Sequence, residues 1–318
     1  MVVIVDALWT TLWVDGHAGP VTGHFTSLIR GVMWRVSGRS HRILSLTGPI
    51  VLITTVLTWA LLLWGGWVAM FSASHTAVVD SQSGAPATLV DRIYFAAYSL
   101  FTMGNGDYRP AGGFWKVATG VASMTGLFFF TLSVTYLLAV IEAVVVKRSF
   151  AGQVTALGKC AEEFVIRSWD GRGFPAVDLL VMSLAEQLNL VTEQHHAYPL
   201  LHYYHESQRN GSVPVGLAVF DDVLTLFLDG IPPEHRPAPG PLLTARGSVD
   251  AFLDTLDEAY IDASDEPPPL PDLNRLRQAG IPVTSVEALR ESAASRDKYR
   301  RLLMGFLEDE RRPWPSRG

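Results

Sequence analysis

Two long stretches of the chain contain no charged side chain. Residues 43–79 and residues 117–141 lack Asp, Glu, Lys and Arg altogether. Each stretch exceeds the roughly 20 residues that a helix needs to cross the hydrocarbon core of a bilayer. Neither has the polar stripe of a surface helix in a soluble protein. The pattern therefore predicts two transmembrane helices, over residues 43–71 and 114–146.

A third apolar segment lies between these spans, after a polar loop. Residues 93–101 carry neither a charge nor a helix breaker. They are too few to cross a bilayer, which favours a re-entrant pore helix over residues 90–101. Non-helical backbone directly after such a helix is tolerated at membrane depth only where it lines a water-filled cavity or is buried in protein.

The backbone at that point reads Thr-Met-Gly-Asn-Gly-Asp over residues 102–107. Glycines in alternation allow left-handed backbone without steric cost. Such a strand can turn successive carbonyl oxygens the same way, as ligands for a bare cation. In isolation Gly-Asn-Gly-Asp is typical of a surface turn. The flanking spans and the short apolar helix favour a pore loop instead.

The order of these segments resembles the two-transmembrane potassium channel family. It runs from a span through a re-entrant helix and the motif Thr-x-Gly-x-Gly-Asp to a second span. The resemblance covers about residues 43–146, and the usual filter of that family reads Thr-Val-Gly-Tyr-Gly-Asp. It implies an all-α membrane protein, a homotetrameric pore around one axis in the lipid bilayer, and K⁺ as the permeant monovalent cation.

The resemblance also implies roles for particular residues. The ion-coordinating filter would comprise Thr102, Met103, Gly104, Asn105 and Gly106. The ligands would be the carbonyls of the first four, together with the Thr102 hydroxyl. Asp107 would lie at the outer mouth and attract cations.

Two departures from the family pattern bear on selectivity. Asn105 stands where the family has a tyrosine, and Phe101 stands where a second threonine usually precedes the filter. Asn105 lacks the ring that braces the filter, although its amide can hydrogen-bond behind it. Phe95, Tyr98 and Phe101 are the candidates for filter support. The choice between K⁺ selectivity and mixed K⁺ and Na⁺ conduction stays open.

Further candidates lie along the second span. The resemblance places a hinge glycine of the inner helix at Gly126, although a membrane glycine can equally serve close helix packing. Phe130, Val134 and Leu138 follow at four-residue steps and are candidates for a cavity lining or a hydrophobic gate. The same stripe is also compatible with ordinary helix packing.

Glu142 is the only acid in the second span. Four symmetry copies of this carboxylate near the inner mouth would form a ring that concentrates cations. An acid within a membrane span is costly and therefore suggests function. The alternative is an interfacial residue already in water beside Lys147.

The distribution of basic residues predicts the topology. Basic side chains precede the first span at Arg30, Arg35, Arg39 and Arg42, and follow the second at Lys147 and Arg148. Positive charge near span ends favours the cytoplasm, so both termini of this cell-membrane protein should be cytoplasmic. Residues 1–42 would form a cytoplasmic segment. Its tryptophans suit either a short interfacial helix or a partly ordered tail.

Residues 150–318 have the charge content and helical periodicity of a helical cytoplasmic domain. Helices are expected after Pro175, from Pro214, from Ser248 and from Thr284, the last continuing to Phe306. Three side chains in this domain suit a metal or a pH-sensitive patch if they share a helix face: His202, His205 and Glu206. Packing beside neighbouring tyrosines is the simpler interpretation.

Composition narrows the function class. The hydrophobic fraction is 48% and the formal net charge is −6, which argues against nucleic acid as a partner. No catalytic constellation or phosphate loop stands out, so we expect neither an enzyme nor an organic cofactor. The sequence predicts a cation channel pore subunit, K⁺-conducting or non-selective. The alternative from another class is a non-conducting membrane scaffold or sensor with a degenerate pore.

Overall fold

The computed structural model describes residues 2–12, 40–257 and 261–316, with Gly19 and residues 22–23, 26, 28–29, 31–32 and 35. The chain divides into two compact units. The first holds most of the described residues before 29, together with residues 50–140. The second holds residues 29–49 and the chain from residue 141 onward.

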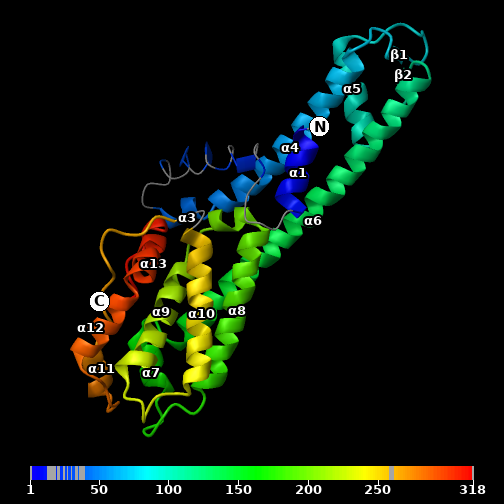
Figure 1. Cartoon of the computed structure of the whole chain (residues 1–318). Coiled ribbons are helices and arrows are strands. Elements are labelled where there is room, and N and C mark those ends of the chain that lie inside the picture. The colour runs from blue at the N-terminus through cyan, green and yellow to red at the C-terminus, as the bar shows by residue number, and fades with distance from the viewer. Residues whose placement is uncertain are drawn as a thin grey trace. The chain divides into compact units, whose positions relative to one another are not determined.

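The first unit is a helical hairpin with a third helix set into it. Its elements are α1 (Val2–Leu12), most of α4 (Thr47–Ser72), β1 (Val78–Asp80), α5 (Leu89–Leu100), β2 (Tyr108–Pro110) and the first part of α6 (Gly113–Leu157). The short helix α3 (His41–Leu44), the start of α4 and the rest of α6 belong to the second unit. Figure 1 shows α5 between α4 and α6, at the end that carries the two strands. Phe71, Phe95 and Ala122 form part of the core that holds these three helices together.

The two predicted membrane spans are confirmed as helices. Residues 41–72 and 113–157 are long and apolar enough to cross a bilayer. Helix α6 has 45 residues, about 68 Å at 1.5 Å per residue, so it is much longer than a hydrocarbon core. The predicted end of the second span at residue 146 stays a prediction, because the helix itself continues beyond it. The charges at Lys147 and Arg148 do not break a helix, and α6 stops only before Gly158.

The pore helix lies within one residue of its predicted range. Thr88 is its N-cap: the Thr88 side chain accepts from the backbone of Asp91, and the Asp91 carboxylate accepts in return from the backbone of Thr88. This reciprocal pair satisfies two backbone donors at the helix start. The strands β1 and β2, which the sequence analysis missed, pair antiparallel from Val78–Pro110 to Asp80–Tyr108. They join the loops before and after the pore helix.

Helix α1 packs against the middle of α4. Ala7 is fully buried in a cluster with Trp59 and Leu63 of α4, and Trp59 lies midway along that helix. The interfacial helix within residues 1–42 stays a prediction. Trp13, Arg30 and Arg39, on which that part of the prediction also drew, lie outside the described residues.

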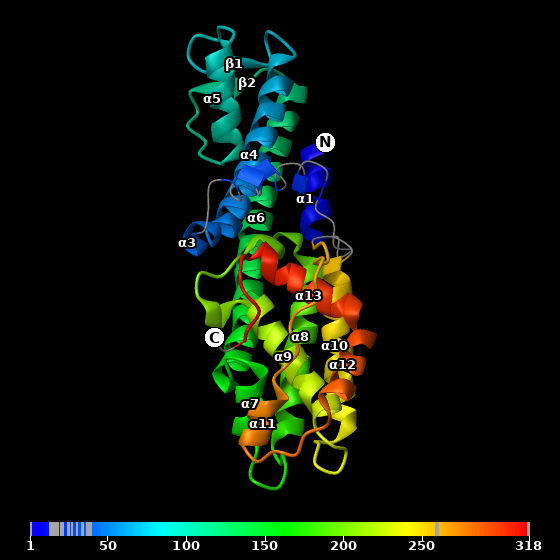
Figure 2. The same ribbon diagram turned by 90° about the vertical axis from the view of Figure 1, so that its left-hand side faces the viewer.

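The second unit is a helical bundle, which confirms the predicted fold class. Its helices are α7 (Ala161–Ser168), α8 (Val177–Ala197), α9 (Val213–Thr225), α10 (Pro239–Asp257), α11 (Leu273–Gln278), α12 (Val286–Ser295) and α13 (Asp297–Asp309). Two 3₁₀ turns (Pro199–Tyr203 and Arg209–Gly211) precede α9, and a π turn (Leu226–Gly230) follows it. Figure 2 shows α8, α9 and α10 side by side. Every residue of α9 is buried.

Two helix boundaries in this unit differ from expectation. Helix α10 begins at Pro239 instead of Ser248, since proline is well tolerated in a first helical turn. The helix expected from Thr284 to Phe306 is two helices, separated at Arg296. Ser285 caps the first of them by accepting from the backbone of Ala288 at 3.1 Å. Tyr260, expected on the acidic helix, lies outside the described residues.

Buried ion pairs connect α9 to α10 and α13. Asp221 pairs with Arg246 of α10, and Asp222 accepts from Arg300 of α13 at 2.9 Å. Trp314 also donates its indole N–H to Asp222, at 2.9 Å. Removing one partner of such a pair would leave a buried charge uncompensated, which is strongly destabilising. The sequence pattern gave no signal for this pairing, because the partners are far apart in the chain.

Candidate ion filter and pore

The backbone of residues 102–106 alternates in handedness. Thr102, Gly104 and Gly106 have φ of 57°, 61° and 84°, whereas Met103 and Asn105 between them keep negative φ. This alternation turns successive carbonyls toward one side. A positive φ is unusual for threonine and marks strain at the first filter position. This is the backbone alternation that a ladder of carbonyl ligands requires, and residues 102–106 are called the candidate ladder below.

The pore helix anchors the start of this ladder. The carbonyl of Tyr98 accepts from the backbone N–H of Met103 at 2.8 Å and of Gly104 at 3.5 Å. The filter strand thus turns back against the last turn of α5. A helix C-terminus carries about half a negative charge. The end of α5 therefore makes the inner end of the ladder favourable for a cation.

Tyr94 holds the half of the candidate ladder nearer Asp107, a role that the sequence pattern did not indicate. Its hydroxyl accepts a hydrogen bond from the Asn105 amide and donates to the Asp107 carboxylate at 3.0 Å. Its ring packs edge-on against Tyr98 at 5.1 Å between centroids. The available signal was spacing, because Tyr94 stands one helical turn before Tyr98. The bond from Asn105 is the amide contact behind the filter that the sequence allowed.

Ser81, from the loop before the pore helix, holds the outer end. Its hydroxyl donates to the carbonyl of Gly106 at 2.6 Å. Its backbone N–H donates to the carbonyl of Asp107 at 2.9 Å. The Gly106 carbonyl already has a donor within the chain, which favours the four preceding residues as ion ligands. Nothing in the sequence pattern pointed to Ser81.

The three residues named as filter support differ in position. Phe95 is buried against Phe71, at 5.0 Å between ring centroids, and so packs toward α4. Tyr98 donates its hydroxyl to the carbonyl of Tyr108 at 2.5 Å, which ties the two sides of the pore loop together. Phe101, at the C-cap of α5, is 51% exposed in the single chain.

Comparison with known proteins agrees with this arrangement. Residues 51–143 match the model of a family described as "Ion channel". The chain is 39% identical over 312 residues to the uncharacterized membrane protein YdjJ of Bacillus subtilis (strain 168), covering 98% of this chain and 92% of that protein. The chain belongs to the two-transmembrane pore-loop ion channel family. No solved structure matches the chain.

In this channel the inner helix α6 packs tightly on the end of the pore helix. A Cβ on Gly126 would lie 1.8 Å from the carbonyl oxygen of Leu100. One turn earlier, the Ser123 hydroxyl donates to the carbonyl of Ser99 at 2.8 Å. This bond ties α6 to the last turn of α5, beside the weaker bond that the same carbonyl accepts from the backbone of Thr102 at 3.4 Å. Gly126 therefore provides close approach to the pore helix, within an α6 that is helical throughout.

The remaining candidates along the inner helix are exposed in the single chain. Phe130, Val134 and Leu138 are 66%, 43% and 60% exposed, and Glu142 is exposed as well. Their four-residue spacing places them on one stripe of α6. This stripe is available to face an axis, a neighbouring subunit or lipid.

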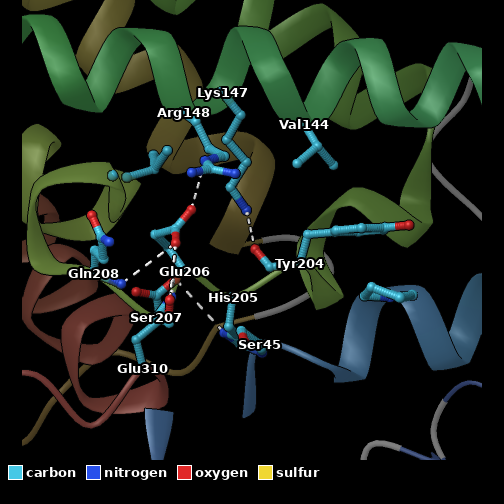
Figure 3. A pocket seen from close by; sticks show the side chains of 13 residues that line it. Ser45, Val144, Lys147, Arg148, Tyr204, His205, Glu206, Ser207, Gln208 and Glu310 are labelled. Carbon is cyan, nitrogen blue, oxygen red and sulfur yellow. Dashed lines mark hydrogen bonds and ion pairs between the residues drawn. The ribbon is translucent and has the colours of Figure 1, made fainter. Parts of the chain in front are cut away.

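Beside Val144, Lys147 and Arg148 of α6, a pocket of about 400 Å³ lies within the second unit (Figure 3). Lys147 is only 5% exposed, and its Nζ donates to the carbonyls of Leu201 and Tyr204 at 3.2 and 3.1 Å. Arg148 pairs with Glu206 at 2.7 Å. A Cβ on Gly48, near the start of α4, would lie 2.5 Å from the Tyr204 ring. Residues 199–206 thus contact the ends of both spans.

The expected helix bearing His202, His205 and Glu206 does not form. Because Pro199 cannot continue α8, that helix ends at Ala197, and the following 3₁₀ turn ends at Tyr203. The described residues contain no group of three or more His, Cys, Asp or Glu side chains able to hold a metal. The metal prediction is therefore wrong.

The histidines instead face acids of α13 and the residue after it. His202 lies 3.7 Å from Asp309, and His205 lies 3.6 Å from Glu310. Burial alone would raise the pKa of Glu310, but the nearby imidazole of His205 and the charge of Lys147 bring that pKa below its usual value. Glu310 is therefore a buried carboxylate, held by Ser212 as well, at 2.6 Å.

Proposed function

We propose that the protein is the pore-forming subunit of a homotetrameric cation channel that conducts K⁺ across the cell membrane. The observation that carries this proposal is the alternation of left-handed backbone at residues 102, 104 and 106, directly after a short helix between two spans. A surface turn needs neither the spans nor the buried pore helix.

In this proposal, four copies of the ladder surround one axis. The carbonyls of residues 102–105 and the Thr102 hydroxyl replace the water shell of the ion. The carboxylate of Asp107, held by Tyr94, attracts cations to the outer mouth. The C-terminal ends of four α5 helices stabilise a cation that waits below the filter.

The bases beside the span ends support an orientation. Arg35 and Arg42 precede the first span, and Lys147 and Arg148 follow the second. Such charges favour the cytoplasmic side. The second unit would then lie in the cytoplasm, with the filter toward the outside.

The function is tested by reconstituting the purified oligomer into liposomes and measuring ion flux. We expect monovalent cation flux, and bi-ionic reversal potentials that favour K⁺ over Na⁺. Equal permeabilities would favour a non-selective channel, for which the replacement of the filter tyrosine by Asn105 is the specific reason. A purified tetramer that passes no monovalent cation would instead identify a scaffold with a degenerate pore.

Replacement of Glu142 by glutamine tests the inner ring of acids. The carboxylate is exposed on α6, four residues beyond Leu138. We expect conductance to fall severalfold at about 10 mM salt, where the Debye length is about 30 Å, and to change little at about 1 M. Single-channel recordings at both salt concentrations measure this. Equal conductance of the two proteins at low salt would remove the ring from the mechanism.

Replacement of Lys147 by methionine tests whether the cytoplasmic bundle is coupled to the inner helix. Methionine keeps the apolar stem but leaves the carbonyls of Leu201 and Tyr204 without their donor. Because unmade buried hydrogen bonds cost about 1–3 kcal/mol, we expect amide exchange in residues 199–206 to quicken about tenfold or more. Channel opening should change together with it.

The matched control is the neighbouring replacement, Arg148→Met. Arg148 is 58% exposed and makes a surface pair with Glu206. Such pairs contribute about 0–1 kcal/mol, so exchange should change far less. Similar acceleration in both variants would contradict a special role for Lys147.

A further inference from the structure

Helix α1 carries a carboxylate in a place where a charge is costly. Asp6 is fully buried. It lies in an otherwise apolar helix that reads Val-Val-Ile-Val-Asp-Ala-Leu-Trp-Thr-Thr-Leu. Its Oδ2 accepts from the indole Nε1 of Trp59 at 2.8 Å. Because Trp59 lies midway along the membrane-capable helix α4, this carboxylate lies beside the middle of that helix.

The chain after α1 returns to the same carboxylate. The Thr22 hydroxyl donates to Asp6 Oδ2 at 2.7 Å, and the Thr22 backbone N–H donates to Oδ1 at 3.4 Å. The backbone N–H of Gly19 donates to the Thr10 hydroxyl at 3.0 Å. A Cβ on Gly19 would lie 2.3 Å from Oδ1 of Asp6, so only glycine fits there. Asp6 thus joins three segments: α1, the returning chain and α4.

The packing around Asp6 reaches the pore. Ala7, Trp59, Leu63, Leu100 and Phe129 form one buried cluster. Leu100 is the last residue of the pore helix, two positions before the filter threonine. Trp59 also contacts the Phe129 ring of the inner helix, edge-on at 5.9 Å. Helix α1 therefore packs on the same cluster as the end of the pore helix and the inner helix.

We propose that α1 and the chain returning at Gly19 and Thr22 form a third membrane-embedded element, which is latched to the first span by Asp6 and braces the pore helix. An intramembrane carboxylate is retained only where it is hydrogen-bonded and serves a purpose. Here the donors from Trp59 and Thr22 fix the depth and register of α1. Asp6 is a positioning residue, since it acts on the filter through Trp59 and Leu100.

Cysteine labelling tests the placement independently of conduction. The native Cys160 is buried, and Cys160→Ser gives a silent background. Val5 is 51% exposed on α1, and Val32 is 50% exposed before the first span. In sealed vesicles of either orientation, we expect Val5→Cys to react with a membrane-impermeant maleimide at least about tenfold more slowly than Val32→Cys. The reason is that a thiol in hydrocarbon does not ionise to the reactive thiolate.

The latch is tested with a matched pair of indole replacements. Trp59→Phe removes the donor to Asp6 and keeps an aromatic ring. Trp64→Phe removes an indole donor that goes to the carbonyl of Ile93, at 3.1 Å. We expect Trp59→Phe to speed the labelling of Val5→Cys about tenfold and to lower ion flux, whereas Trp64→Phe leaves the labelling rate unchanged.

Rapid labelling of Val5→Cys in the otherwise unchanged protein, at the rate of Val32→Cys, would overturn the embedded placement and make α1 a surface helix. If Trp59→Phe and Trp64→Phe changed the labelling rate of Val5→Cys equally, the proposed role of the Asp6–Trp59 hydrogen bond would be overturned. The labelling arm decides even if no variant conducts, so its failure is distinguishable from failure of the proposed channel function.

Discussion

Replacing Gly126 by alanine is expected to destabilise the pore domain itself. The new Cβ would lie 1.8 Å from the carbonyl oxygen of Leu100, and 2.7 Å from its carbonyl carbon. Both are backbone atoms at the end of the pore helix, so no side chain can rotate away. Overpacking usually lowers the free energy of unfolding by about 1–3 kcal/mol. Because the obstacle here is rigid backbone, we expect a loss at the upper end of that range. Little folded, monodisperse protein should survive detergent extraction.

Gly120→Ala is the matched control. Gly120 lies earlier on the same helix, and a Cβ there would meet nothing within 4 Å in the single chain. Alanine should therefore be tolerated, or even slightly stabilising, because it is the better helix former. Size-exclusion profiles and thermal unfolding of both variants provide the measurement. If Gly126→Ala folds as well as Gly120→Ala and alters only channel opening, then the hinge interpretation holds and the packing interpretation fails.

The sequence was sufficient for those elements whose signal is local. Two uncharged runs predicted α4 and α6, and a short apolar segment predicted α5 to within a residue. The ends of helices were harder to predict than their centres, because a helix end depends on the particular residue that stops the helix. Charges at Lys147 and Arg148 marked a membrane boundary, yet α6 runs on to Leu157. Helix α8 ends at Ala197, two residues before Pro199.

The parts of the site that escaped prediction are contacts between distant segments. Ser81 meets Gly106 and Tyr94 meets Asn105 only because β1 and β2 pair and close the loops around α5. Likewise, Asp6 stands out as an acid in the apolar start of the chain, but its partner could not be predicted because Trp59 is 53 positions away. Periodicity reports which face of a helix is buried, not what covers it.

Replacing Tyr94 by phenylalanine is expected to weaken the K⁺ preference proposed above, while the channel still folds. The hydroxyl accepts from the amide of Asn105 and donates to the carboxylate of Asp107. Phenylalanine keeps the ring against Tyr98 but removes both bonds in every subunit. A net hydrogen bond contributes about 1 kcal/mol, and more when one group is charged. Because about 1.4 kcal/mol corresponds to a tenfold change, the K⁺ to Na⁺ permeability ratio should fall about tenfold or more.

Tyr108→Phe separates this effect from the general loss of a pore-loop hydroxyl. The Tyr108 hydroxyl bonds the carboxylate of Asp91 at the start of the pore helix instead of the filter, and that bond raises the pKa of Tyr108 to about 12. Its removal should leave reversal potentials close to those of the parent channel. If the parent channel is selective and Tyr94→Phe has the same K⁺ to Na⁺ permeability ratio, then the ladder is held by Ser81 and Tyr98 alone. Asn105 would then occupy the position of the family tyrosine without needing its contact with Tyr94. Its amide would be free to rotate toward the outer mouth, beside Asp107.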